Sequence, residues 1–293
     1  CRMTKKVAIS TWCTDDYVDL IGLDKLHNSI KHFHPEIDHV IVDSKMTKEI
    51  EKEIPWMKNI WMMAPSCLPL ADEYDMVIHL DGDAVVTGPL DEMINSTAEI
   101  IGVRNNNSLN QAGAHDGITI RHMEPFGNGS DIPLQGFINA GMIAAQGKDF
   151  WEDWHDVNSQ VADVTNKGFY NPGWGDENDT LNQIFHSDKY NSEVIDPTGS
   201  GVSYGLSNVW GTGNNHWESW SQIYVKDDRL YLNDMIKSGW STVPGDPMCI
   251  KVLHQAGGSI AAELNRSAGG FRNWMKTVVS DEVKDYLEMV ENG

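Results

Sequence analysis

The sequence predicts an α/β fold, and three features of its first half support that prediction. An apolar segment at residues 7–10 is followed by apolar positions at helical spacing through Phe33, and a second apolar segment begins at His39. This order of strand, helix and strand is typical of a parallel pair joined by a right-handed crossover. The third feature is the run at residues 76–86, whose β-branched side chains are typical of a buried strand. Such sheets bind ligands beyond the carboxyl ends of their strands.

Apolar periodicity and turn residues predict the remaining elements. Helices are expected at residues 46–54, 91–94, 148–165, from 180 onward and within 271–290, and strands at 100–103, 136–145 and 249–253. A hairpin is expected at 222–232, turning at Asp227 and Asp228. The three prolines of residues 55–70 predict an irregular segment, and the polar stretch 104–134 is typical of a functional or a disordered loop. No clear linker divides the chain, so we expect a single main domain.

The composition excludes some classes of partner. The 293 residues carry a formal net charge of −21, from 43 acidic and 22 basic side chains, which argues against nucleic acid and anionic membranes as main partners. A site for phosphates would therefore need positive charge from a metal ion.

The four cysteines lack metal-type spacing and predict reduced thiols, and no apolar run nears the ~20 residues that span a bilayer. We expect a soluble, intracellular, cytoplasmic protein. The 11 tryptophans suit either core packing or stacking on sugar rings.

Two carboxylates, Asp81 and Asp83, flank Gly82 at the end of the buried run. In extended backbone, side chains at i and i+2 lie on one side of the strand, so these two charges would repel each other. A hard divalent cation removes that conflict, and oxygen ligands suit Mg²⁺ or Mn²⁺. Gly82 lets the chain bend or a ligand approach closely. The alternative is an acidic turn without a ligand. His79, which alternates within the strand, is interpreted as packing.

Two further polar features need an explanation. Asn139 lies in a run that is otherwise apolar, so its side chain needs a partner from the backbone or from a ligand. Four polar residues, Asp176 to Asp179, precede a helix, where negative charge is favourable. Capping of that helix would need one or two of them but not all four.

Four stretches, in this order, resemble the retaining glycosyltransferases of the GT-A superfamily, in particular its family 8, the glycogenin and bacterial galactosyltransferase group. They are Thr14-Asp15-Asp16-Tyr17, Leu80-Asp81-Gly82-Asp83 with Val85, Phe137-Ile138-Asn139-Ala140-Gly141, and Leu253-His254 with Gly257; Asp179-Thr180-Leu181-Asn182 also matches the end of the family's Asp-Gln-Asp-x-Leu-Asn block. The resemblance covers about residues 6–260. It implies a Rossmann-like GT-A domain, with a mixed central sheet between helices, over residues 1–265. A helical extension over 266–293 is expected to pack on it.

The resemblance implies a metal-dependent transfer of a hexose from a nucleotide sugar, with a UDP-sugar as the expected donor, to a glycan, protein or small acceptor, with retention. It assigns Mn²⁺ or Mg²⁺ to Asp81, Asp83 and His254. Nucleotide and sugar contacts are expected from Thr11, Asp15, Tyr17, Asp81, Gly82, Asn139, Ala140, Gly141, Asn178 and Gly257. Catalytic roles are expected for Asp176, Glu177 and Asp179, and acceptor contacts for Trp174, Trp210 and Trp217.

The chain departs from the family 8 pattern at three places. The signature lysine after His-x-x-Gly falls at Ile260, and the lysine upstream of Asp-x-Asp falls near Ala64. The Asp-Gln-Asp block reads Glu177-Asn178-Asp179, with Asp176 before it. Substitutes for the missing diphosphate contact are Lys251, Arg266 or Arg272. Together these departures suggest a relative of the superfamily and not a standard family 8 member.

Two rival functions use the same residues. A phosphatase of the haloacid dehalogenase type would use Asp81 as its nucleophile and Asp176 with Asp179 at its metal. Those two acids are too close together for that motif, and Asn139 and His254 would then have no role. The other rival is a non-catalytic binder of sugars or nucleotides on the same fold, which would bind its ligand without turnover.

Overall fold

The computed structural model describes residues 5–13, 23–42, 63–82, 84–104, 138–166, 176–195, 202–203, 223–232, 248–254 and 280–293. The predicted helix at 46–54 and the predicted loop at 104–134 therefore lie mostly or wholly outside the described residues. None of the helices in the described part of the chain combines the length and the apolar character that crossing a bilayer requires.

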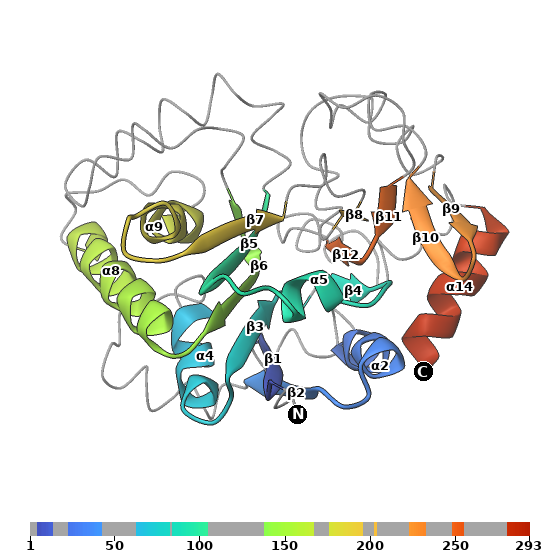
Figure 1. Ribbon diagram of the computed structural model, residues 1–293, viewed down its shortest axis with the longest axis horizontal. Helices are drawn as coiled ribbons and strands as arrows, with labels where there is room; N and C mark the ends of the chain where they lie inside the picture. Colours follow the sequence, from blue (N-terminus) through green and yellow to red (C-terminus); the bar gives the residue numbers. More distant parts are fainter. Residues whose placement is uncertain are drawn as a thin grey trace, which may run out of the picture.

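A six-stranded mixed sheet forms the centre of the molecule (Figure 1). Its order is β2-β1-β3-β6-β5-β7. The strands are β1 (Val7–Trp12), β2 (Asp38–Val42), β3 (Met76–Leu80), β5 (Ile100–Arg104), β6 (Ile138–Gln146) and β7 (Ser192–Ile195). β1 runs parallel to β2 and β3, whereas β6 is antiparallel to β3 and β5. The parallel β1–β2 pair and the mixed sheet confirm the predicted α/β class.

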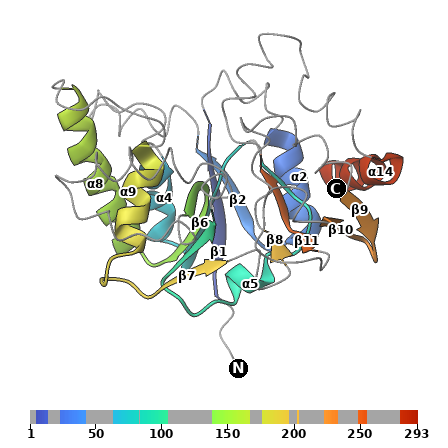
Figure 2. The ribbon, with the colours of Figure 1, turned by 90° about the horizontal axis from the view of Figure 1, so that it is seen from above.

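Helices cover both faces of this sheet (Figure 2). One face carries α4 (Met63–Ala71), α8 (Asp149–Asn166) and α9 (Asp176–Phe185), and the other carries α2 (Leu23–Phe33). Trp151 and Trp154 of α8 are fully buried against the first face, and Met76 and Ile78 belong to the core on the second. Each such side chain contributes about 1.5–3 kcal/mol by leaving water. The two cores fix the sheet between its helices.

Smaller sheets flank the second face. β4 (Ala84–Val86) pairs with β12 (Val252–His254), and β8 (Val202–Ser203), β11 (Met248–Ile250), β10 (Arg229–Leu232) and β9 (Ile223–Lys226) form a four-stranded sheet. The predicted hairpin is confirmed: β9 and β10 pair across Asp227 and Asp228, which take φ angles of 49° and 51°. Aspartate tolerates this left-handed region better than most residues. A short helix, α5 (Asp91–Ile94), follows β4.

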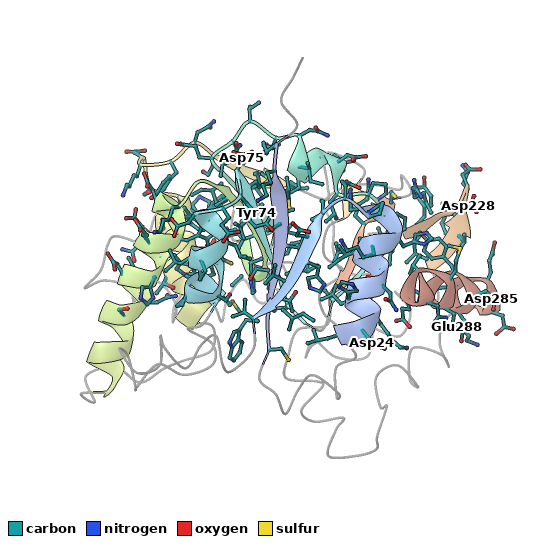
Figure 3. The ribbon with its side chains drawn as sticks, turned by 90° about the horizontal axis from the view of Figure 1, so that it is seen from below. Asp24, Tyr74, Asp75, Asp228, Asp285 and Glu288 are labelled. Atoms are coloured by element: carbon teal, nitrogen blue, oxygen red, sulfur yellow. The ribbon has the colours of Figure 1, made fainter. Side chains whose placement is uncertain are left out.

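The C-terminal helix α14 (Asp281–Asn292) packs against α2. The Ser280 hydroxyl caps its first turn by accepting a hydrogen bond from the Val283 amide. Lys25 of α2 forms an ion pair of 2.7 Å with Glu291, and the Tyr286 hydroxyl donates to the Thr87 carbonyl at 2.7 Å. Acidic side chains such as Asp24, Asp285 and Glu288 lie on the outside of these two helices (Figure 3).

Three predicted elements differ from the structure. Residues 63–71 were expected to be irregular, yet they form α4, with Pro69 inside the helix. Burial of Ala64 and Cys67 against the sheet outweighs the missing proline hydrogen bond. The single strand expected over 76–86 is instead two strands, β3 and β4, which belong to different sheets. The predicted strand at 249–253 is likewise divided, with Lys251 between β11 and β12.

Candidate functional site

The site begins where β3 ends, at Asp81. Its amide donates to the Gly141 carbonyl at 2.9 Å, and its own carbonyl accepts from the Ala84 amide at 3.1 Å. The second bond closes a tight turn that contains Gly82. The chain therefore turns after Asp81, where Gly82 was expected to let it bend, and does not stay extended as far as Ala84. The Asp81 side chain is 26% exposed, at the carboxyl end of the strand where such sheets bind ligands.

The pairing of β12 with β4 brings a distant segment to this turn. His254 lies directly opposite Ala84, and Leu253 opposite Val85. The backbone of His254 is thus brought to the turn that begins at Asp81. The Asp83 residue and the side chain of His254 lie outside the described residues. Within the described set, no group of three histidine, cysteine or acidic side chains is placed to hold a metal ion.

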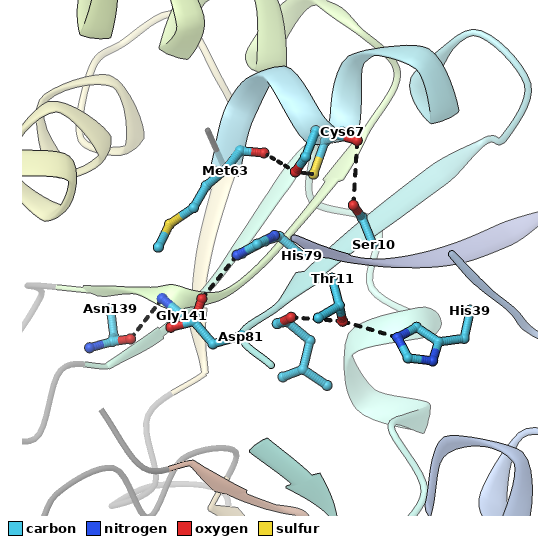
Figure 4. Close-up of polar contacts among 11 residues, drawn as sticks. Ser10, Thr11, His39, Met63, Cys67, His79, Asp81, Asn139 and Gly141 are labelled. Atoms are coloured by element: carbon cyan, nitrogen blue, oxygen red, sulfur yellow. Dashed lines mark hydrogen bonds and ion pairs between the residues drawn. The ribbon is translucent and has the colours of Figure 1, made fainter. Parts of the chain in front are cut away.

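Asn139 lies beside Asp81 on the neighbouring strand β6 (Figure 4). Its Oδ1 accepts a hydrogen bond of 2.8 Å from the Gly141 amide. Because only the carboxamide oxygen can accept, this bond fixes the orientation of the group and directs its NH₂ elsewhere. The partner that Asn139 needs is thus partly its own backbone, and its NH₂ can donate to ligand oxygens. Ala140, the next residue, is almost fully buried.

The β5–β6 ladder is interrupted at the same place. Gly102 pairs with Ile143, but the next residue, Val103, pairs with Asn139, so residues 140–142 form a bulge. Bulges commonly redirect side chains next to functional sites. Gly102 is required by close packing, since a Cβ atom there would lie 2.6 Å from the Ile138 side chain.

Helix α9 is clamped to the start of β6 by Asn182. The Asn182 Oδ1 accepts from the Ile138 amide at 2.8 Å, and its Nδ2 donates to the Ile138 carbonyl at 2.9 Å. Both bonds are buried, where losing one partner would leave polar groups unsatisfied. The clamp sets α9 beside Asn139, and sequence patterns could not reveal it because it joins segments that are distant in the chain.

A second buried contact holds the first turn of α9. The Thr180 hydroxyl donates to Asn158 and accepts from the indole of Trp154, both on α8. The residues predicted to be catalytic, Asp176, Glu177 and Asp179, and the predicted sugar contact Asn178 occupy this first turn. Their backbone is therefore held firmly next to β6, whereas their side chains lie outside the described residues. Their assigned roles stay predictions.

His79 is a participant that the sequence interpretation missed. Its Nε2 lies 3.2 Å from Asp81 Oδ1, and the ring is 1% exposed. Burial opposes the charged imidazole, but hydrogen bonding to Asp81 and the influence of the buried Cys67 thiol outweigh burial and raise the pKa of His79 to about 9. The signal was present in the sequence, because residues 79 and 81 share one face of a strand.

Thr11 hydrogen-bonds to the last residue of β3, directly before Asp81. Its side chain is fully buried, and its hydroxyl donates to the Leu80 carbonyl at 2.9 Å while bonding His39 Nε2 at 3.0 Å. The hydroxyl is thus already engaged within the protein, and a nucleotide contact from Thr11 stays a prediction. The other predicted contacts, Asp15, Tyr17 and Gly257, lie outside the described residues, as do Trp174, Trp210 and Trp217.

The structure also bears on the missing family lysines. Lys251 donates to the Pro89 carbonyl at 2.8 Å and forms an ion pair of 3.3 Å with Glu92, so its ammonium is already engaged and does not suit the diphosphate. Ala64 is fully buried on the inner side of α4, which removes that position as a sugar contact. The remaining candidates, Arg266 and Arg272, lie outside the described residues.

No protein-family model matches the chain, and no curated protein matches it in sequence. Among solved structures it is similar to the galactosyltransferase LgtC in complex with donor and acceptor sugar analogues, with a TM-score of 0.50 and 14% identity over 95% of this chain and 99% of that chain. An active-site mutant of LgtC gives a TM-score of 0.51 and 13% identity, over 97% and 95% of the chains. Apo mouse xyloside xylosyltransferase 1 gives 0.49 and 14%, over 85% and 96%. The chain therefore has the α/β fold of the GT-A glycosyltransferases that its motifs resemble.

Proposed function

We propose that this chain is a metal-dependent glycosyltransferase of the GT-A type, related to family 8. It would move a hexose, with retention, from a nucleotide sugar to a glycan, protein or small acceptor, and a UDP-hexose is the expected donor. One observation supports this most directly: strand register sets His254 beside the Asp81–Ala84 turn. That pairing brings the backbone of His254 to the strand end at which Asp81 lies.

The residues present fit a divalent cation in their chemistry. Asp81, Asp83 and His254 would hold it, and an imidazole beside two carboxylates favours Mn²⁺ over Mg²⁺. The ion, when bound, would neutralise negative charge that develops on the leaving nucleoside diphosphate. The net charge of −21 supports the need for such a counter-charge. Lys251, bonded to Pro89 and Glu92, is poorly placed to supply it.

The remaining residues would bind and orient the donor sugar. Asn139, whose orientation is set by the Gly141 amide, would donate from its NH₂ to a sugar hydroxyl. The acids of the first turn of α9 would act on the bound sugar from that helix. Asp176 or Glu177 would face the anomeric carbon as nucleophile or as ion-pair stabiliser, and Asp179 would accept from sugar hydroxyls. The Asn182 clamp and the Thr180 contact would keep this turn in place.

The test is donor turnover by the purified chain. A panel of UDP- and GDP-hexoses is incubated with Mn²⁺, with Mg²⁺ or with EDTA, and released nucleotide is measured. We expect release with one donor class, loss in EDTA, and at least about a hundredfold loss in the Asp81→Asn variant, as for loss of a major electrostatic contact. NMR of the first-formed anomer tests retention. Turnover that is insensitive to EDTA would contradict the metal role, and nucleotide binding without turnover would favour the non-catalytic binder.

The phosphatase alternative is less compatible with this fold, which matches glycosyltransferases along nearly its whole length. It also gives no role to the pairing that places His254 at the Asp81 turn. Hydrolysis of p-nitrophenyl phosphate that is lost in Asp81→Asn would revive it.

A further inference from the structure

The contact between His79 and Asp81 has a defined geometry. Val77, His79 and Asp81 alternate along β3 and its end, so they share the face that looks toward α4, where Val77 and Cys67 belong to one core. The imidazole Nε2 lies 3.2 Å from Asp81 Oδ1 (Figure 4). Because an ionised carboxylate can only accept, Nε2 carries the hydrogen.

The imidazole has little freedom to turn away. The ring is 1% exposed, and Cys67 of α4 is fully buried beside it. Within the described part of the chain, the buried Nδ1 atom has no hydrogen-bond partner of normal geometry, so no described residue draws the ring away from the contact at Nε2. A buried ring in a packed strand keeps its rotamer, which makes it a rigid support for the carboxylate.

We propose that His79 is a positioning residue that holds the Asp81 carboxylate in the orientation required for binding the divalent cation. This inference rests on the proposed function. The backbone of Asp81 is fixed by the Gly141 carbonyl, but its side chain stands at the point where strand becomes turn. One bond from a rigid imidazole restricts that side chain. Hydrogen-bond partners of metal ligands typically improve metal affinity or activity 10–100-fold.

The competing explanation is that His79 only fills space in the core. Matched substitutions separate the two. His79→Leu removes the donor and keeps an apolar side chain. His79→Gln carries an amide N–H at about the position of Nε2, whereas His79→Asn carries the same group one methylene shorter. His34→Gln is the control for loss of a buried histidine, because His34 accepts a bond from the Leu90 amide and is 4% exposed.

The experiment measures Mn²⁺ binding to the full chain by electron paramagnetic resonance of free Mn²⁺, alone and with saturating UDP. We expect His79→Leu and His79→Asn to raise the Kd for Mn²⁺ at least about tenfold. His79→Gln should stay within about threefold of the wild type, and His34→Gln should be unchanged. Thermal unfolding of each variant reports on folding, and the Gln and Asn pair decides the result if His79→Leu does not fold.

Three results would overturn the inference or its basis. Unchanged Mn²⁺ binding in both His79→Leu and His79→Asn would refute the positioning role, and so would equal weakening in His79→Gln and His34→Gln. Failure of the wild-type chain to bind Mn²⁺ any better than Asp81→Asn would instead refute the metal site of the proposed function. The failures of the inference and of the proposed function are therefore distinguishable.

Discussion

Two histidines on either side of β1, the partly buried His39 and the buried His79, prefer opposite charge states. His39 of β2 pairs with Ile9, and His79 of β3 pairs with Ser10, so the two lie at adjacent levels of one sheet. Burial lowers the pKa of His39 to about 3, assisted by the nearby His27 and Lys31 charges. The pKa of His79, which is more deeply buried, is instead raised to about 9.

The neighbours explain this difference. Thr11 donates its hydroxyl hydrogen to the Leu80 carbonyl, so it accepts from Nε2–H of His39. The Nδ1 of His39 is then an acceptor, and it lies 3.1 Å from Nδ1 of His27. The hydrogen-bond partners of His39 among the described residues include no acid, so it works as a neutral support, whereas His79 faces a carboxylate. Burial alone does not identify a histidine of a functional site; an acidic partner at a strand end is more informative.

The largest expected effect is the loss of stability in acid caused by His39. The pKa of His39 in the folded chain lies below the ordinary histidine value of 6.5. As the pH falls, the unfolded chain therefore binds the proton at a higher pH than the folded chain does. The free energy of unfolding that depends on a neutral His39 is fully present above pH 6.5. It is lost at about 1.4 kcal/mol per pH unit as the pH falls toward 3. Between pH 7 and 4 the free energy of unfolding should fall about 3 kcal/mol more in wild type than in His39→Gln. Urea unfolding measures this, and parallel pH profiles would contradict it.

The expected effect of His79 has the opposite sign. Its folded pKa is raised, so its contribution is fully present below pH 6.5 and is lost as the pH rises to about 9. Wild type in EDTA should lose about 2–3 kcal/mol more than His79→Gln between pH 6.5 and 9. Urea unfolding at matched pH values tests this. If His79→Gln loses as much as wild type, the imidazole is not charged in the folded state and the contrast between the two histidines fails.

Elements that are decided by local pattern could be predicted from the sequence, and elements that are decided by tertiary contacts could not. Apolar runs and turn residues predicted β1, β2, β6, α8 and the β9–β10 hairpin, because each is decided by local pattern. The helix α4 was missed because its prolines argue for a loop locally, and only burial of Ala64 and Cys67 against the sheet reverses that preference. A bend at Gly82 was expected, but the division of the run between two sheets was missed because apolar residues continue on both sides of the glycine.

Some contacts of the site residues could likewise be predicted from the sequence, and others could not. The proximity of His254 to the Asp81 turn depends on register between β12 and β4, so a motif resemblance could suggest it but periodicity could not. The Asn182 clamp on Ile138 is likewise a tertiary contact. The His79–Asp81 contact was different, since side-chain alternation already placed both residues on one face of the strand.

Thr11 offers a smaller test of the hydrogen bonds around the neutral imidazole of His39. Thr11→Val keeps the shape but leaves the buried Leu80 carbonyl and His39 N–H without this partner. An unsatisfied buried group costs about 1–3 kcal/mol, so we expect a loss of about 2 kcal/mol in the free energy of unfolding. Thr11→Ser keeps the hydroxyl and should lose about 1 kcal/mol, for one methyl group. A valine variant as stable as the serine variant would show that this hydroxyl does not support the network.

The smallest expected effect concerns the thiol beside His79. Cys67 favours the charged imidazole together with Asp81, so Cys67→Ala should lower the pKa of His79 while Asp81 keeps it above 6.5. Loss of the buried sulfur should also cost about 1 kcal/mol of stability through the small cavity it leaves. NMR titration of the His79 ring in EDTA, with Cys67→Ser as the polar control, separates these effects. If Cys67→Ala lowers stability without moving the His79 titration, the thiol only packs. The carboxylate of Asp81 would then be sufficient to give His79 and His39 their opposite charge states.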